Sequence, residues 1–138
     1  MSQKDLYHNA AIIALIADGW QITHDPLTIT YGRRNLFVDL GAEQPIGAEK
    51  EGYKIAVEIK SFVGPSDINE LQSAVGQYNL YRDILAETEP DRELYMAIPS
   101  FAFDGIFSEP VGQLTITRQR LKLIVFSDKD ERIIQWII

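Results

Sequence analysis

The chain has 138 residues, of which 46% are hydrophobic and 24% are charged, and its formal net charge is −7. This length fits one domain over residues 1–138 with a sizeable core, and the composition excludes a disordered or fibrous protein. The absence of cysteine excludes disulfides and cysteine-based metal sites, and the acidic charge argues against strong nonspecific binding to nucleic acid, unless a bound cation or a basic partner intervenes.

The N-terminal sequence "MSQKDLYHN" lacks the layout of a signal peptide. The longest apolar run, "AAIIALIA", is too short to span a bilayer. We therefore expect a cytoplasmic protein that makes no membrane contact.

The first third of the chain predicts a helix followed by short strands. Residues 4–18 place apolar side chains over much of a helical circumference, which is typical of a well-covered helix. β-Prone segments at residues 20–24 and 27–31 flank an Asp-Pro turn signal. Residues 35–42 alternate apolar and polar side chains and predict one further strand.

The middle of the chain predicts a β-hairpin. Residues 46–50 and 53–62 are two β-prone segments on either side of a Glu-Gly turn. The second arm alternates strictly, with Ile55, Val57 and Ile59 on one side. This period of two indicates a half-buried strand.

Residues 64–87 predict the next helix, because apolar side chains recur at helical spacing and Asp67 with Glu70 resembles a capping box. Residues 94–100 are a short apolar run typical of a buried strand. We expect this strand to run parallel to strand 53–62 through a right-handed crossover.

Residues 101–120 predict helical turns, and residues 121–126 and 133–138 predict a terminal hairpin. The predicted elements follow one another along the chain in the order helix, strands, helix, strand, helical region and two strands. This order is typical of an α/β (α+β) fold in which helices flank a mixed β-sheet.

Three charged residues of the predicted strands form a candidate catalytic site. Glu58 and Lys60 share one side of their strand, and antiparallel pairing would bring Asp39 beside Glu58. Two adjacent carboxylates repel each other, and Mg²⁺ (or Mn²⁺) resolves the conflict because it prefers oxygen ligands. Such an ion polarises a phosphodiester, and a neighbouring lysine stabilises the charge of the transition state.

Gln77 and Tyr81 lie four residues apart on the predicted helix and favour the catalytic interpretation, because both side chains can hold a water or a phosphate oxygen. The same pattern also fits an exposed Glu58–Lys60 ion pair beneath an ordinary amphipathic helix. His8 and His24 are the only histidines, and we interpret each as a surface or capping group rather than part of a zinc site.

Longer stretches of the sequence resemble known families. Asp39, "VEIK" at residues 57–60 and "GQY" at residues 76–78 resemble the PD-(D/E)XK nuclease superfamily, although Val38 stands where the superfamily has a proline. The words "DGWQITHDPLTI", "VDLGAE", "AEKEGYKIAVEIKSFVGPSDINEL", "AVGQYNLYRDIL" and "LKLIVF" are similar to the XisH family of cyanobacterial fdxN element excision controlling factors.

The superfamily resemblance implies a restriction-endonuclease-like core. It also implies that Asp39 and Glu58 are metal ligands, that Lys60 is the catalytic lysine and that Gln77 is an auxiliary residue. Glu49 is a second candidate acid on the hairpin arm facing Glu58, and an exposed hairpin charge is the simpler interpretation. The XisH resemblance implies a role in a DNA rearrangement alongside a small partner called XisI.

Two functions from different classes stay open. The first is Mg²⁺-dependent hydrolysis of DNA phosphodiesters. The second is a non-catalytic accessory or regulatory factor that binds DNA or a protein partner, which the acidic charge and the apolar C-terminal run "IIQWII" favour. We expect this run either to fill the core or to contact another subunit, in a homodimer or in a complex with XisI.

Overall fold

The computed structural model describes residues 7–44 and 52–138. Within them, the chain forms eight strands, four α-helices and one short 3₁₀ helix. The strands are β1 (Gln21–His24), β2 (Leu27–Tyr31), β3 (Arg34–Val38), β4 (Leu40–Gln44), β5 (Tyr53–Ile59), β6 (Arg92–Pro99), β7 (Leu123–Ser127) and β8 (Arg132–Ile137). The helices are α1 (His8–Ala17), α2 (Asp67–Thr88), α3 (Ser100–Asp104), η1 (Ile106–Ser108) and α4 (Pro110–Arg118).

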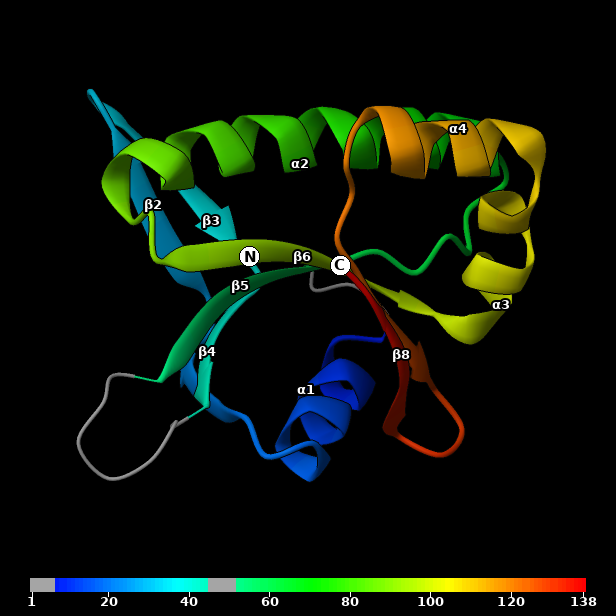
Figure 1. Ribbon diagram of the computed structural model, residues 1–138, viewed down its shortest axis with the longest axis horizontal. Helices are drawn as coiled ribbons and strands as arrows, with labels where there is room; N and C mark the ends of the chain where they lie inside the picture. The colour runs from blue at the N-terminus through cyan, green and yellow to red at the C-terminus, as the bar shows by residue number, and fades with distance from the viewer. Residues whose placement is uncertain (1–6, 45–51) are drawn as a thin grey trace.

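Six strands form the main sheet in the order β1-β4-β5-β6-β7-β8, and β2 pairs with β3 in a separate two-stranded sheet. β5, β6 and β7 run parallel, whereas the pairs outside them are antiparallel. α2 and α4 lie on one face of the main sheet and α1 lies on the other (Figure 1). The predicted mixed sheet flanked by helices is confirmed, as is the parallel β5-α2-β6 unit.

Each face of the main sheet has its own hydrophobic core. Along β5, Ala56 packs in the core beneath α2, whereas Ile55, Val57 and Ile59 pack in the core around α1. The predicted alternation is therefore confirmed. The prediction that β5 is only half-buried is wrong, because α2 covers the second face and buries every residue from 55 to 59.

The strand predicted over residues 35–42 is two strands. β3 pairs with β2, with Val38 opposite Leu27, and β4 pairs with β5 in the main sheet. Asp39 lies at the junction, where the chain passes from one sheet to the other. Unbroken alternation in the sequence gives no sign of this break.

Within the described part of the chain, the hairpin partner of β5 is β4. The predicted arm at residues 46–50, which carries Glu49, lies outside the described residues. Residues 4–6 of the first predicted helix lie outside them as well, and the described helix begins at His8.

The predicted helix over residues 64–87 is α2, but its cap differs from the expected Asp67 capping box. The Ser66 hydroxyl accepts a hydrogen bond from the Asn69 N–H at 3.3 Å, which satisfies one of the free N–H groups of the first turn. The Glu70 carboxylate instead accepts the Gly64 N–H at 3.2 Å and fixes the loop before the helix.

The C-terminal predictions are confirmed. The region of helical turns contains α3, η1 and α4, and β7 pairs with β8 as a terminal antiparallel hairpin. Trp136 and Ile137 pack against the two cores, whereas Ile134 and Ile138 are exposed. In the parts of the chain that the structure describes, no helix is both long and apolar enough to cross a membrane.

Candidate functional site

The pairing of β4 with β5 brings Asp39 and Glu58 together. Leu40 lies opposite Val57, so the residues next to this pair, Asp39 and Glu58, also lie opposite each other. The Asp39 N–H donates to Glu58 Oε1 at 3.1 Å, and the Ile59 N–H donates to Asp39 Oδ2 at 2.7 Å. The backbone of each strand therefore holds the carboxyl group of the other.

Lys60 follows the last residue of β5 and completes the group. Its backbone N–H donates to the Ala97 carbonyl at 2.9 Å, which continues the pairing of β5 with β6. Its Nζ lies 3.6 Å from Glu58 Oε2 and its side chain is 28% exposed. The structure thus brings the three predicted residues Asp39, Glu58 and Lys60 together at the carboxyl end of β5.

The electrostatics of the site centre on Glu58, which is only 5% exposed. Burial, followed by the negative charge of Asp39, raises the pKa of Glu58 to about 8, and the positive charge of Lys60 opposes this shift. The proton is therefore held more tightly by Glu58 than by an ordinary carboxyl group, and the neighbouring Asp39 side chain contributes to this rise in the pKa of Glu58.

Tyr81 of α2 lies over this pair of acids. Its side chain is 8% exposed. Burial raises the pKa of Tyr81, and the charges of Glu58 and Asp39 raise it further. The effect of both charges on the pKa of Tyr81 shows that its phenol lies within electrostatic range of the two carboxyl groups, on the α2 side of the site.

Gln77 is exposed, and its side chain makes no hydrogen bond with any described residue. It lies four residues before Tyr81 and four residues after Ser73, so all three project from the same side of α2. Ser73 lines a hollow that also contains Lys60. Gln77 therefore shares the side of α2 that carries Tyr81 and Ser73, and no hydrogen bond of the described residues joins its side chain to either acid.

The hollow beside Lys60 has a volume of about 280 Å³. Its lining residues are Lys60, Ser61, Phe62, Asn69, Glu70 and Ser73. Phe62 has a left-handed backbone (φ 59°), which is unusual for a bulky residue, and its ring packs edge-to-face on Phe107 at 5.2 Å. This contact holds the turn that directs the chain away from Lys60.

Asn69, Ser73 and Phe62 were not predicted as site residues. Asn69 and Ser73 precede Gln77 at intervals of four, a helical spacing that was available in the sequence. The left-handed backbone at Phe62 has no such signal, because the contact with Phe107 joins residues distant in the chain.

The residues that can hold a metal here are Asp39 and Glu58. Among the described residues, no group of three or more His, Asp or Glu side chains is arranged to hold a metal ion. Glu49, the second candidate acid, lies outside the described residues. The two acids thus provide a pair of oxygen ligands rather than a closed cage.

The histidines belong to other parts of the structure. His8 is buried, and its Nε2 lies 3.0 Å from Asp25 Oδ1. The interpretation of His8 as a surface or capping group is therefore wrong, because α1 turns this residue towards the sheet and the Asp25 corner. His24 Nδ1 lies 2.9 Å from the Thr23 hydroxyl and is exposed.

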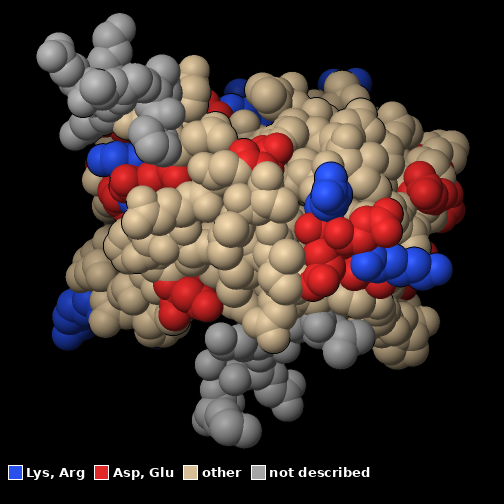
Figure 2. Space-filling model, turned by 90° about the horizontal axis from the view of Figure 1, so that it is seen from below, with Lys and Arg blue, Asp and Glu red and all other residues tan. Residues whose placement is uncertain are grey.

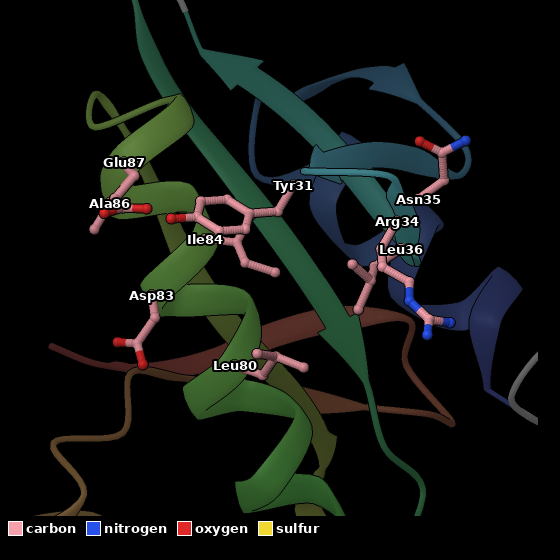
Figure 3. Close-up of a pocket in the computed structure, with 9 residues that line it drawn as sticks. All are labelled: Tyr31, Arg34, Asn35, Leu36, Leu80, Asp83, Ile84, Ala86 and Glu87. Atoms are coloured by element: carbon pink, nitrogen blue, oxygen red, sulfur yellow. The ribbon is translucent and has the colours of Figure 1, made fainter.

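A second hollow, of about 870 Å³, lies between α2 and the β2–β3 hairpin. Tyr31 reaches from the hairpin towards Ile84 and Glu87 of α2, and Leu36 and Leu80 lie on opposite sides of the space (Figure 3). None of Asp39, Glu58 and Lys60 lines this hollow, so its size does not bear on the proposed chemistry.

Comparisons with known proteins agree with this architecture. The family model described as XisH protein matches residues 1–134. The crystal structure of an XisH family protein from Nostoc punctiforme PCC 73102 is 40% identical, with a TM-score of 0.88, over 97% of this chain and 100% of that chain. The crystal structure of an fdxN element excision controlling factor protein from Anabaena variabilis is also 40% identical, with a TM-score of 0.87, over 98% of this chain and 100% of that chain. No curated protein matches the chain. Because the family model and both structures cover nearly the whole sequence, this chain belongs to the XisH family.

Proposed function

We propose that this protein is a metal-dependent nuclease of the PD-(D/E)XK type, with a restriction-endonuclease-like core. It hydrolyses DNA phosphodiesters with Mg²⁺ or Mn²⁺ at Asp39, Glu58 and Lys60. The observation that carries this proposal is the interlocked pair of acids: each carboxyl group accepts a backbone N–H from the other strand, and Lys60 Nζ lies 3.6 Å from Glu58.

The acid pair fits a hard divalent cation. The backbone hydrogen bonds use Asp39 Oδ2 and Glu58 Oε1, whereas Glu58 Oε2 lies 3.6 Å from Lys60 Nζ. A cation bound here would take the remaining capacity of these carboxyl oxygens beside the lysine. Without a cation, burial and then the charge of Asp39 raise the pKa of Glu58 and favour its protonated form. A cation that replaces this proton satisfies both acids, and Mg²⁺ commonly uses only one or two carboxylates together with water.

When bound, such an ion would polarise the phosphodiester and lower the pKa of a coordinated water. The chain's own residues supply the remaining functions. Lys60, partly exposed beside Glu58, stabilises negative charge on the reacting phosphate. Tyr81 and Gln77, on the same side of α2, position the substrate or the attacking water.

We also propose that this activity serves the excision of a DNA element, because the relative from Anabaena variabilis is an fdxN element excision controlling factor. In this role the protein would act in the cytoplasm with DNA and a small XisI-like partner, as a monomer or a homodimer. The net charge of −7 opposes the approach of DNA, and a bound cation or a basic partner would offset this repulsion.

The direct test is cleavage of linear, supercoiled and branched DNA with Mg²⁺ or Mn²⁺, with and without an XisI protein. We expect Glu58→Gln and Lys60→Met to lower the rate by a factor on the order of 10² or more, since each removes a group at the reacting phosphate. Asp104→Asn, which neutralises an exposed acid outside the site, is the matched control and should keep the wild-type rate. Cleavage by Glu58→Gln at the wild-type rate on every substrate would refute the proposal.

A second candidate, a non-catalytic accessory factor, is favoured by one feature of the site. A Glu58 that stays protonated at neutral pH satisfies the acid pair without any metal. Titration with Mn²⁺ in a calorimeter separates the two candidates. Equal and negligible heats for the wild type and Asp39→Asn would support the accessory role, whereas heat lost only in Asp39→Asn would support the nuclease.

A further inference from the structure

A groove of about 430 Å³ opens on the α1 face of the main sheet, at the end where β5 and β6 begin. It is distinct from the acid pair, because Glu58 projects towards α2 on the opposite face. Four aromatic residues contribute to its lining, namely Trp20, Tyr53, Tyr95 and Trp136.

The aromatic rings form a fixed surface. The Trp136 ring packs edge-on against Tyr95 at 5.0 Å and tilts against Trp20 at 5.8 Å. Tyr53 and Ile138 lie at the opening and are 62% and 85% exposed. Apolar and aromatic side chains gathered in one hollow of the surface mark a binding site rather than a random scatter of exposed residues.

The rim of the groove is negatively charged. Asp18, Asp91 and Glu93 are exposed acids that line it, and Lys54 is the one basic residue among the described residues of the lining. Lys122, outside this lining, pairs with Glu93. Asp18 also follows the end of α1, where the helix dipole adds partial negative charge. Figure 2, which views the molecule from the α1 side, shows Asp and Glu side chains in separate groups, some of them beside Lys or Arg, between broad areas of uncharged surface.

Aromatic faces beside carboxylates attract organic cations. The chain already contains one example next to the groove, because Lys122 Nζ lies 3.2 Å from Glu93 and 6.0 Å from the Tyr95 ring centre. The groove therefore selects a ligand that combines positive charge with apolar surface.

The length of the groove indicates the kind of ligand. It extends across the sheet from Tyr53 of β5 to Trp136 of β8, which are three strand spacings apart. Three spacings are about 14 Å, the length of roughly four or five residues of extended chain. A metal ion or a single side chain would fill only part of this length.

We propose that this groove binds an extended segment of a partner protein in which arginine or lysine alternates with aliphatic residues. The basic side chains lie against Asp18, Asp91 and Glu93, and the aliphatic side chains cover Trp136 and Ile138. This binding is separate from the proposed DNA hydrolysis and requires neither a metal nor Lys60.

The test uses a short acetylated and amidated peptide of alternating leucine and arginine, titrated into the full chain. The chain's two tryptophans both line the groove, so intrinsic fluorescence reports occupancy directly. We expect saturable binding that weakens about 10-fold in the double variant Asp91→Asn/Glu93→Gln, because two rim charges are lost. The matched double variant Asp83→Asn/Asp104→Asn removes two exposed acids elsewhere and should bind within about 2-fold of the wild type.

Two further arms identify the source of the affinity. A peptide with citrulline in place of arginine keeps the shape without the charge and should bind about 10-fold more weakly. Tyr53→Ser removes an exposed ring and should weaken binding without loss of the fold. Equal binding of the two peptides, or no fluorescence change up to millimolar peptide, would overturn the proposal. A dimer of the chain alone that Tyr53→Ser dissociates would also overturn it, because the occupant would then be a second copy.

Discussion

Replacement of Glu58 by Gln should change how stability depends on pH. Folding raises the pKa of this carboxyl group from 4.5 to about 8, chiefly through burial. The folded protein therefore holds the proton more tightly than the unfolded chain. The resulting stabilisation is complete below pH 4.5, is lost as the pH rises through about 8, and amounts to about 5 kcal/mol in total.

Between pH 6 and pH 9, this linkage predicts a loss of about 2.5 kcal/mol from the free energy of unfolding of the wild type. Glu58→Gln keeps an acceptor for the Asp39 N–H and cannot ionise, so it should lack this loss. Urea denaturation followed by circular dichroism, with a chelator present, measures the difference between the two proteins. Glu109→Gln, at an exposed carboxyl group, serves as the control. A difference between wild type and Glu58→Gln that stays constant across this pH range would refute the burial argument.

Three further predictions concern the metal, a helix end and a buried hydroxyl. Mn²⁺ binding to the acid pair should release about one proton at pH 7 and almost none at pH 9, because the cation displaces the proton of Glu58. Calorimetry in buffers of different ionisation enthalpy measures the number of protons released. A number that does not change with pH would contradict this prediction. Arg120→Gly should raise the free energy of unfolding, measured by urea denaturation, by about 0.5–1 kcal/mol. Residue 120 follows α4 with a left-handed φ of 51°, and the Leu121 N–H donates to the Ile116 carbonyl, which is a helix end that favours glycine. An unchanged free energy of unfolding would show that Arg120 is not strained. Tyr78→Phe should lower the free energy of unfolding by about 1–3 kcal/mol, because the Tyr78 hydroxyl donates to the Leu94 carbonyl and accepts a hydrogen bond from the Lys122 N–H. Thermal unfolding measures the change, and an unchanged midpoint would show that water takes the place of the hydroxyl.

Most of the secondary structure can be predicted from the sequence, because the period-two and helical patterns of apolar residues match the faces that are buried in the folded protein. β5 shows where this reasoning fails: its alternation correctly predicts which residues share a face, but it cannot show that α2 covers the polar face. As a result Glu58, which the alternation alone would place on a solvent-exposed face, is buried and has a raised pKa. Burial of a charged side chain depends on a helix that begins eight residues after β5, and a local pattern does not contain that information.

Asp39 shows a second limit. The alternation through residues 35–42 predicts one strand, yet the chain changes sheets at Asp39. This change is what frees the Asp39 N–H and carboxylate for Glu58 and Ile59, because neither β3 nor β4 includes Asp39 in its backbone pairing. The residue type at position 39 could be identified as a candidate ligand from the sequence, but the break that gives it two hydrogen bonds to β5 could not.

The arrangement of the site depends on one register, that of β4 against β5. Leu40 opposite Val57 places Glu58 beside Asp39, while Val57 and Ile59 enter the α1 core. A shift of β5 by one residue would move Glu58 into that apolar core and expose Val57 to α2, and burial of an uncompensated carboxylate costs several kcal/mol. The same hydrophobic alternation that selects this register therefore also holds the acid pair together, so the site needs no interaction of its own to stay assembled. It follows that Asp39→Asn, which keeps an acceptor for the Ile59 N–H, should leave the register and the fold intact while it removes the charge that a cation requires.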